Sequence, residues 1–493
     1  MLFNSPIFVV FYLAVFLLYW GLRQRRPQNL LLIVASYVFY GSWSWKFLLL
    51  LMASTLFDFG CGLAIDAARG PGRRRLFLAA SVTANLTLLG VFKYAGFFTH
   101  QAAEFLAGLG ITVQPWTLQI VLPIGLSFYT FQSLGYVIDV YRRKLPAVRS
   151  LEEYALYVAF FPQLVAGPIE RATHMLPQYR APRVFSGAAL ESGLMLMVWG
   201  LFKKMVIADN LAPYVNHVFE NPASFSGGGL LTALVFFTFQ IYCDFSGYSD
   251  CARGVARTLG FDLMINFNLP YFSQNPVEFW RRWHISLSQW FQDYLYFPLA
   301  MRYMRRGGFA SKYKAHIISF ALIGLWHGAN WTFIVFGLYW GLLIAGYLYI
   351  QERLNDLPDD SPFRFQSAGG AAAVLRGAVS ILVTFTIACC GWLLFRADSL
   401  ATAWQVFERI VSAAPGASQL VRADVIGAGQ LWLMVIGLWS CELIYRYYPA
   451  ALALVTGSPA RRLVWRQALV VGILVSYFAS QQGKSLPFIY FQF

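Results

Sequence analysis

One segment places an ionisable side chain at an interruption between two apolar runs, an arrangement suited to acid–base chemistry. It reads Gly324-Leu-Trp-His-Gly-Ala-Asn-Trp331 and joins the runs 316–326 and 331–350. If the two runs face each other, His327 lies beside irregular backbone, which a membrane tolerates only next to a cavity or inside protein. A shielded histidine can take a proton from a hydroxyl group, because its pKa is close to working pH. The alternative is a packing histidine bonded to a carbonyl.

A second segment, residues 275–293, is rich in tryptophan, arginine and polar side chains. Read as one helix, it carries a stripe at spacings of three and four residues, formed by Arg281, His284, Ser288 and Gln292. Tryptophan and arginine together favour a helix near a membrane interface, partly buried in the protein. We interpret His284 as a second candidate for catalysis. The alternative is an ordinary interfacial helix with a solvated histidine.

A third segment, residues 240–250, carries polar side chains within an apolar run. Gln240 and Asp244 share one face of a helix at a spacing of four. A carboxylate in such a run must be paired or must line water. Asp244 therefore either orients a histidine or arginine from another segment or belongs to a structural ion pair.

The composition of the chain indicates that these segments lie in a membrane. Of the 493 residues, 58% are hydrophobic and 12% are charged, with 38 Lys and Arg against 23 Asp and Glu. With so few charged residues, a soluble fold could not cover its surface with groups that interact well with water. The chain is therefore predicted to be an all-α integral membrane protein, and the scattered basic clusters argue against nucleic-acid binding.

The apolar runs predict roughly 10 to 12 transmembrane helices, with re-entrant or interfacial pieces, in one domain spanning 1–493. We expect no cleavable signal peptide, because no basic residue precedes the first run, residues 6–22. Basic clusters at 23–26, 73–75 and 142–144 follow alternate runs, which predicts that they are cytoplasmic and that the N-terminus is periplasmic.

Several long motifs, taken in order, resemble the membrane-bound O-acyltransferases, and in particular their bacterial polysaccharide branch. The matching stretches cover essentially the whole chain and are residues 123–132, 160–171, 244–250, 279–290, 325–331 and 487–493. The resemblance implies a helical shell around a transmembrane tunnel, with a catalytic core at about 116–350. The invariant histidine of the family corresponds to His327, and its second histidine to His284.

The resemblance also implies an O-acetyltransferase of the bacterial inner membrane. Acetyl-CoA would be the cytoplasmic donor and no cofactor or metal would be needed. The acceptor would be a hydroxyl of an exopolysaccharide such as alginate or of a periplasmic partner, with an SGNH-type transferase often completing the reaction. Besides the two histidines, the candidates to line the tunnel are Asn330, Trp326, Arg281, Ser288, Gln240, Asp244 and Asn275.

Two alternatives remain open from the sequence. The first is a relative that transfers another acyl group, D-alanyl or long-chain, to a lipid, a teichoic acid or a protein. The second is a transporter or channel, in which broken helices and buried charges are also usual. A transporter predicts internally related halves, and the sequence shows none.

Overall fold

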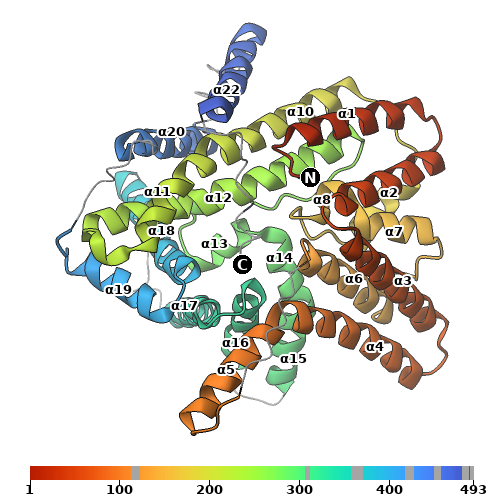
Figure 1. Ribbon diagram of the computed structural model, residues 1–493, viewed down its shortest axis with the longest axis horizontal. Helices are drawn as coiled ribbons and strands as arrows, with labels where there is room; N and C mark the ends of the chain where they lie inside the picture. Colours follow the sequence, from red (N-terminus) through yellow and green to blue (C-terminus); the bar gives the residue numbers. More distant parts are fainter. Residues whose placement is uncertain are drawn as a thin grey trace. The chain divides into compact units, whose positions relative to one another are not determined.

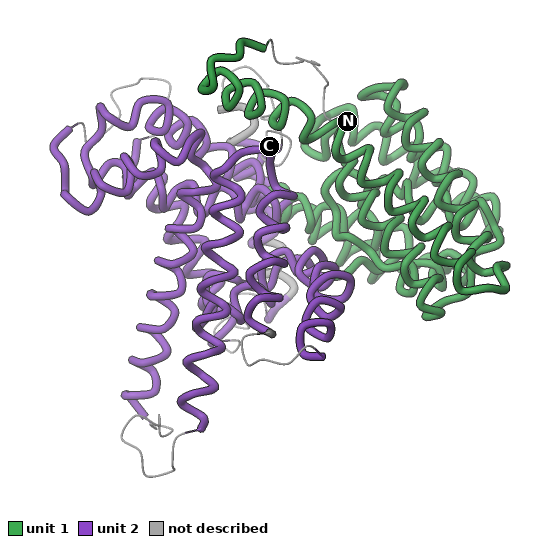
Figure 2. Tube along the Cα trace, turned by 90° about the horizontal axis from the view of Figure 1, so that it is seen from below, with its two compact units in different colours: residues 1–201, 248–264 green, residues 202–247, 265–493 purple. Residues whose placement is uncertain are grey.

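The computed structural model describes residues 1–113, 123–305, 311–356, 370–416, 427–448, 457–479 and 488. Within these ranges all regular structure is helical and no strand occurs, which confirms the all-α class. Figure 1 labels the helices along the chain. The chain divides into two compact units, which Figure 2 distinguishes by colour and which are described separately below. Unit 1 contains residues 1–201 and 248–264, and unit 2 contains residues 202–247 and 265–493.

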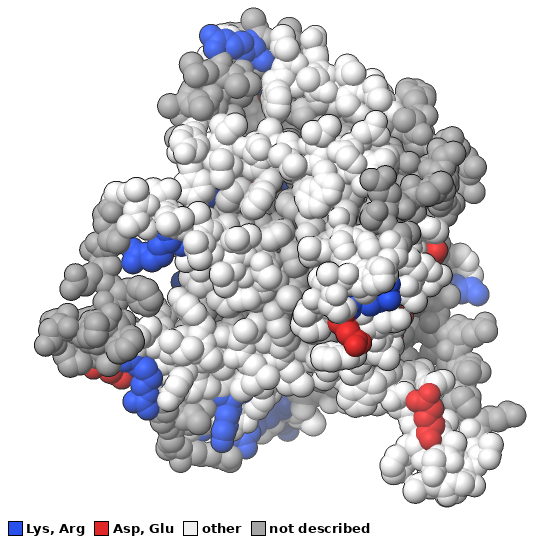
Figure 3. Space-filling model, turned by 90° about the vertical axis from the view of Figure 1, so that its left-hand side faces the viewer, with Lys and Arg blue, Asp and Glu red and all other residues white. Residues whose placement is uncertain are grey.

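Six helical segments among the described residues are long and apolar enough to cross a membrane: Trp45–Ala67, Pro71–Gly108, Gly227–Thr258, Trp331–Asn355, Ala371–Arg396 and Ala428–Tyr447. Shorter apolar helices occur at Pro6–Gly21 and Val464–Val475. The sequence also predicts an apolar run at 116–140, of which residues 116–122 lie outside the described residues and the remainder contains a helix. On the face drawn in Figure 3, uncharged side chains cover most of the described surface, as an apolar solvent requires.

Unit 1 is built from α1 (Pro6–Gly21), α2 (Arg25–Gly41), α3 (Trp45–Ala67), α4 (Pro71–Leu89), η1 (Gly90–Tyr94), α5 (Ala95–Gly108), α6 (Leu126–Tyr141), α7 (Leu151–Ala159), α8 (Phe161–Leu164), α9 (Ala172–Arg180) and α10 (Gly187–Leu201). Most of α6 is buried, and so is α7 from Tyr154 onward, because neighbouring helices pack on several sides of them. They form the interior of this unit.

Glu170, from the motif at 160–171, is a buried carboxylate that links two segments of unit 1. Its Oε2 lies 2.7 Å from Nδ1 of His174, and its Oε1 accepts a hydrogen bond of 2.6 Å from the backbone N–H of Met264. The bond to Glu170 raises the pKa of His174. Glu170 of this motif therefore connects His174 with the backbone at Met264 within unit 1.

Unit 2 contains η2 (Phe202–Ala208), α11 (Asp209–Glu220), η3 (Pro222–Ser224), η4 (Pro270–Phe272), α13 (Pro276–Arg282), α14 (Ile285–Phe291), η5 (Gln292–Tyr296), α15 (Phe297–Arg305), α16 (Ser311–His327), α17 (Trp331–Asn355), α18 (Ala371–Arg396), α19 (Leu400–Val411), α20 (Ala428–Tyr447) and α22 (Pro459–Ala479). The long helix α12 (Gly227–Thr258) belongs to unit 2 up to Gly247 and to unit 1 from Tyr248.

Helices α16 and α17 form a hairpin and pack against each other. Glycine makes this approach possible: a Cβ on Gly324 would lie 2.1 Å from the carbonyl oxygen of Phe333. At the far end of the hairpin, Lys312 Nζ lies 2.5 Å from Glu352 Oε1. His327 and this ion pair therefore mark opposite ends of α16.

Candidate active site

His327 occupies the break that the sequence predicted. It is the last residue of α16, and α17 begins at Trp331 after a short irregular connection. A Cβ at Gly328 would lie 2.1 Å from a ring carbon of Phe333, so the connection fits only with glycine at this position. Asn330 caps α17 by accepting a 3.1 Å hydrogen bond from the N–H of Thr332. The break is therefore a packed structural feature of the hairpin.

The His327 side chain is buried among aromatic rings. It is 5% exposed, and its ring centroid lies 4.8 Å from that of Trp326, 5.1 Å from Phe395 and 5.9 Å from Phe336. Phe395 comes from α18 and Phe336 from α17. An imidazole in such a place is shielded from bulk water, which strengthens its interactions with any polar group brought to it.

His284 is fully buried and has an unusual backbone conformation. Its φ is +42°, in the left-handed region that side chains other than glycine rarely adopt. Its ring centroid lies 4.6 Å from Phe245 of α12 and 6.1 Å from Trp326. Trp326 therefore contacts both histidines, which belong to one aromatic cluster within unit 2.

The expectation of a single helix over 275–293 is wrong. α13 ends at Arg282 and α14 starts at Ile285, with His284 at the bend between them. Because of this bend, His284 leaves the stripe on which it was predicted and enters the aromatic cluster. Burial lowers the pKa of His284 to about 3, so the imidazole is neutral at neutral pH.

Asn266, which the sequence analysis did not single out, holds this bend. Its carbonyl oxygen accepts a 2.9 Å hydrogen bond from the N–H of Ile285. Its side-chain oxygen accepts from Ser286, at 3.2 Å from the N–H and 2.9 Å from the hydroxyl. The residue is 1% exposed. A lone asparagine in a loop gives no sequence signal for this role, because its partners lie about 20 residues away.

Arg281 and Ser288 line a separate pocket of about 370 Å³, together with Gln292 of the predicted stripe. Trp280 and Ser319 also line it, and their buried Nε1 and Oγ atoms have no hydrogen-bond partner among the described residues. Arg281 brings a positive charge, and no Asp or Glu is present among the described lining residues. Such a pocket can hold a ligand that has negative charge and hydrogen-bond acceptors.

Asp244 forms a buried ion pair, which favours the second of its two predicted roles. Its Oδ1 accepts a hydrogen bond from Nζ of Lys204, and the same Nζ lies 2.8 Å from Oδ1 of Asp209. The next residue, Phe245, packs against His284. The ion pair therefore holds the part of α12 that supports the histidine. Gln240, one turn earlier, is buried, and its Oε1 has no partner among the described residues.

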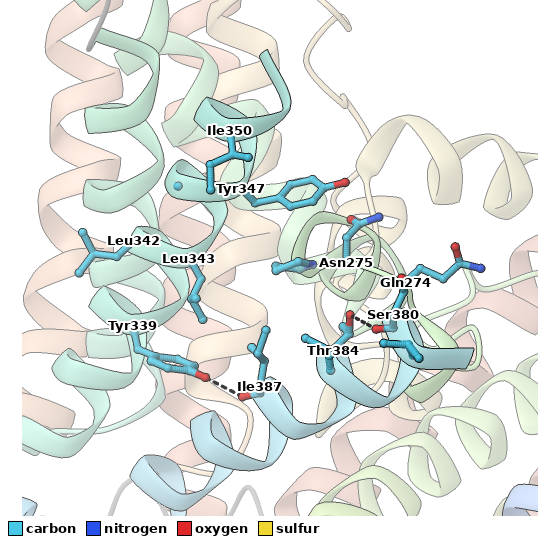
Figure 4. A pocket seen from close by; sticks show the side chains of 14 residues that line it. Gln274, Asn275, Tyr339, Leu342, Leu343, Tyr347, Ile350, Ser380, Thr384 and Ile387 are labelled. Carbon is cyan, nitrogen blue, oxygen red and sulfur yellow. Dashed lines mark hydrogen bonds between the residues drawn. The ribbon is translucent and has the colours of Figure 1, made fainter. Parts of the chain in front are cut away.

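Asn275 lies at a different place in unit 2. It caps α13 by accepting a 2.8 Å hydrogen bond from the N–H of Glu278. It also lines an apolar groove of about 650 Å³ between α17 and α18, which Figure 4 shows from close by. The residues that line this groove do not include either histidine.

Residues 32–389 match the model of the membrane-bound O-acyltransferase family, MBOAT. The chain is 40% identical over 432 residues to the probable alginate O-acetylase AlgI of Pseudomonas aeruginosa, covering 87% of this chain and 78% of the relative.

Two further relatives extend the comparison. Identity to the probable alginate O-acetylase AlgI of Pseudomonas putida is 37% over 514 aligned residues, which cover both chains completely. Identity to the peptidoglycan O-acetyltransferase of Helicobacter pylori is 33% over 444 residues, covering 83% of this chain and 80% of the relative.

Proposed function

The chain belongs to the membrane-bound O-acyltransferase family, and on that premise we propose that it moves an acetyl group from cytoplasmic acetyl-CoA to a hydroxyl acceptor across the membrane. It is a multi-pass membrane acyltransferase. The observation that carries the proposal is the shielded His327 at the α16–α17 break, in contact with Trp326, which also contacts His284. The relatives' names, which specify O-acetylation, support acetyl as the group transferred.

In the proposed reaction His327 acts as the general base. It accepts the proton of the acceptor hydroxyl while that oxygen attacks the carbonyl carbon of the thioester. A new C–O bond forms, the C–S bond breaks, and the thiolate of CoA leaves and takes up a proton. Dipoles of the site, including those of His284 or Asn330, would stabilise the oxyanion that develops on the carbonyl. No metal or cofactor takes part in this scheme.

We assign the donor to the pocket lined by Arg281 and Ser288. A cationic guanidinium suits the phosphates of CoA. Ser319 Oγ and Trp280 Nε1, which have no hydrogen-bond partner within the described part of the chain, suit the acceptor groups of the pantetheine arm. His316 of α16 lines the same pocket. Because α16 runs from this region to His327, the pocket lies on the helix that ends at the base.

Arg281→Ala is expected to weaken donor binding while leaving the chemical step intact. A charge-assisted hydrogen bond contributes about 1.5 kcal/mol or more, so the KM for acetyl-CoA should rise roughly tenfold with kcat nearly unchanged. Steady-state kinetics with varied acetyl-CoA measure this. Arg461→Ala, which removes an exposed arginine outside the pocket, is the matched control. A fall in kcat at constant KM would show that Arg281 does not bind the donor.

The acceptor is proposed to be a hydroxyl of a polysaccharide such as alginate, or of a periplasmic SGNH-type partner that completes the transfer. The names of the relatives include alginate and peptidoglycan, both rich in hydroxyl groups. D-alanyl or long-chain donors remain the alternative within the family.

We propose that the protein lies in the bacterial inner membrane with a periplasmic N-terminus and cytoplasmic basic clusters. Arg73 is exposed, at the start of α4. After Arg73→Cys in intact cells, an impermeant thiol reagent added outside should leave position 73 unmodified until the membrane is permeabilised. Labelling at position 73 in intact cells would show that this position is periplasmic, which would contradict the proposed orientation.

The proposed function is tested with purified protein in lipid nanodiscs and acetyl-CoA labelled in the acetyl group. Release of free CoA together with labelled alginate or partner protein is the expected result, and D-alanyl and long-chain acyl donors should give no transfer. If labelled acetyl-CoA is neither bound nor consumed with any hydroxyl acceptor, the proposal fails.

A further inference from the structure

Helix α19 presents a stripe of large apolar side chains that remain exposed among the described residues. The stripe recurs at spacings of four, three and four residues and consists of Leu400 (40% exposed), Trp404 (65%), Phe407 (41%) and Val411 (69%). At 3.6 residues per turn these positions lie almost in line along the helix. An exposed continuous stripe of this kind needs a partner.

The rest of α19 shows that its apolar face is wider than the part buried by protein. Ala403 and Val406 are buried against unit 2, on the face next to the exposed stripe. The polar side chains Gln405 and Glu408 are exposed on the opposite side of the stripe. The half of the apolar face with Ala403 and Val406 is therefore buried against protein, and the half with the stripe is exposed. The polar face, with Gln405 and Glu408, can contact water. An interfacial helix lying in the plane of a membrane has this division.

The position of α19 in the chain puts it at the end of a membrane-crossing helix. It starts at Leu400, directly after α18, which is long and apolar enough to span the membrane and ends at Arg396 (Figure 1). The carbonyl oxygen of Asp398 accepts a 2.9 Å hydrogen bond from Nδ2 of Asn330, beside the α16–α17 break. At the other end of α19, Arg409 Nη2 donates to the carbonyl oxygens of Phe225 and Pro415, at 2.7 and 2.8 Å. Both ends of the helix are thus fixed to unit 2.

We propose that α19 is an in-plane membrane anchor whose stripe of Leu400, Trp404, Phe407 and Val411 inserts into a lipid bilayer at the boundary between headgroups and acyl chains. The leaflet is the one on the His327 side of the α16–α17 hairpin, away from the Lys312–Glu352 pair. Tryptophan and phenylalanine favour this depth, and the helix carries only a few charges to bind a soluble partner. Because Asn330 holds the carbonyl of Asp398, the anchor also sets how deep the break with His327 lies below the membrane surface.

Spin labelling in nanodiscs tests the proposal independently of catalysis. A variant with its six cysteines replaced receives Trp404→Cys or Phe407→Cys, and the matched controls are Gln405→Cys and Glu408→Cys on the polar face. Labels at 404 and 407 should collide several-fold more with oxygen than with a water-soluble nickel chelate, relative to labels at 405 and 408. Equal chelate collision at 404 and 405 would place the stripe in water. Shielding of 404 from both reagents would mean a protein partner or a second copy. Either result overturns the proposal.

A second measurement uses the protein with its native cysteines, in case the cysteine-free variant does not fold. A benzophenone amino acid replaces Trp404, or Gln405 as the control, and cells are irradiated before purification. Mass spectrometry should find phospholipid adducts at position 404 and none at 405. Adducts at position 404 consisting only of protein would contradict membrane insertion.

Discussion

Replacing His327 by alanine is expected to abolish acetyl transfer while the protein still folds and inserts into the membrane. Loss of a general base typically lowers the rate by about 10²–10⁴-fold. The side chain lies among the rings of Trp326, Phe336 and Phe395, none of which can accept a proton in its place. The measurement is transfer of labelled acetyl from acetyl-CoA by purified protein, with membrane yield determined in parallel.

His327→Gln separates the role of a base from that of packing. Glutamine keeps much of the size and polarity of the side chain but cannot accept the proton, so transfer should be lost as well. Binding of CoA should persist in both variants, because the proposed donor pocket is lined by other residues. His100→Ala, at an exposed position in unit 1, is the control and should retain full activity. If His327→Gln transferred acetyl at more than about a tenth of the wild-type rate, the base role would be wrong.

Lys204→Met is expected to be the most destabilising single change in the buried charge cluster of unit 2. Its Nζ contacts the carboxylates of both Asp209 and Asp244. Without it, the carboxylates of Asp209 and Asp244 lose the cation that they share. Breaking a buried ion pair by removing one partner costs about 3–5 kcal/mol.

Asp244→Asn should be much milder, because Lys204 keeps its contact of 2.8 Å with Asp209. We therefore expect Lys204→Met to aggregate well below the temperature at which Asp244→Asn does. The measurement is the fraction of detergent-solubilised protein that remains monodisperse after heating through a temperature series. Equal stability of the two variants would show that Lys204 does not hold the cluster together. The less stable variant should also have the lower transfer activity, because Phe245, the residue after Asp244, packs on His284.

The sequence alone was sufficient for the class of the protein and for the position of the helix break at His327, the residue that we propose as the base. The small number of charges excludes a soluble exterior. The regular structure of the described residues is helical, with six segments suited to crossing a membrane. The break at His327 was predictable because its signal is local: two apolar runs meet at a short segment that contains glycine. The structure has α16 end at His327 and α17 begin at Trp331.

The surroundings of His284 were decided by tertiary structure. Residues 276–293 contain no glycine, and their only proline is at the first helical position, so a continuous helix was the natural reading. Hydrogen bonds from Ile285 and Ser286 to Asn266 stabilise a bend instead. Because a bend at one residue changes which side chains share a face, Arg281 and Ser288 line one pocket while His284 enters the aromatic cluster.

The partner of Asp244 could not be predicted from the sequence either. A buried carboxylate must be compensated, but this requirement names no partner, and Lys204 is 40 residues away on another element. Spacing along one helix determines which residues share a face, because helical geometry is local. Which faces then meet depends on packing between distant segments, and that packing brings together Trp326, His284 and Phe245 from three separate helices or turns.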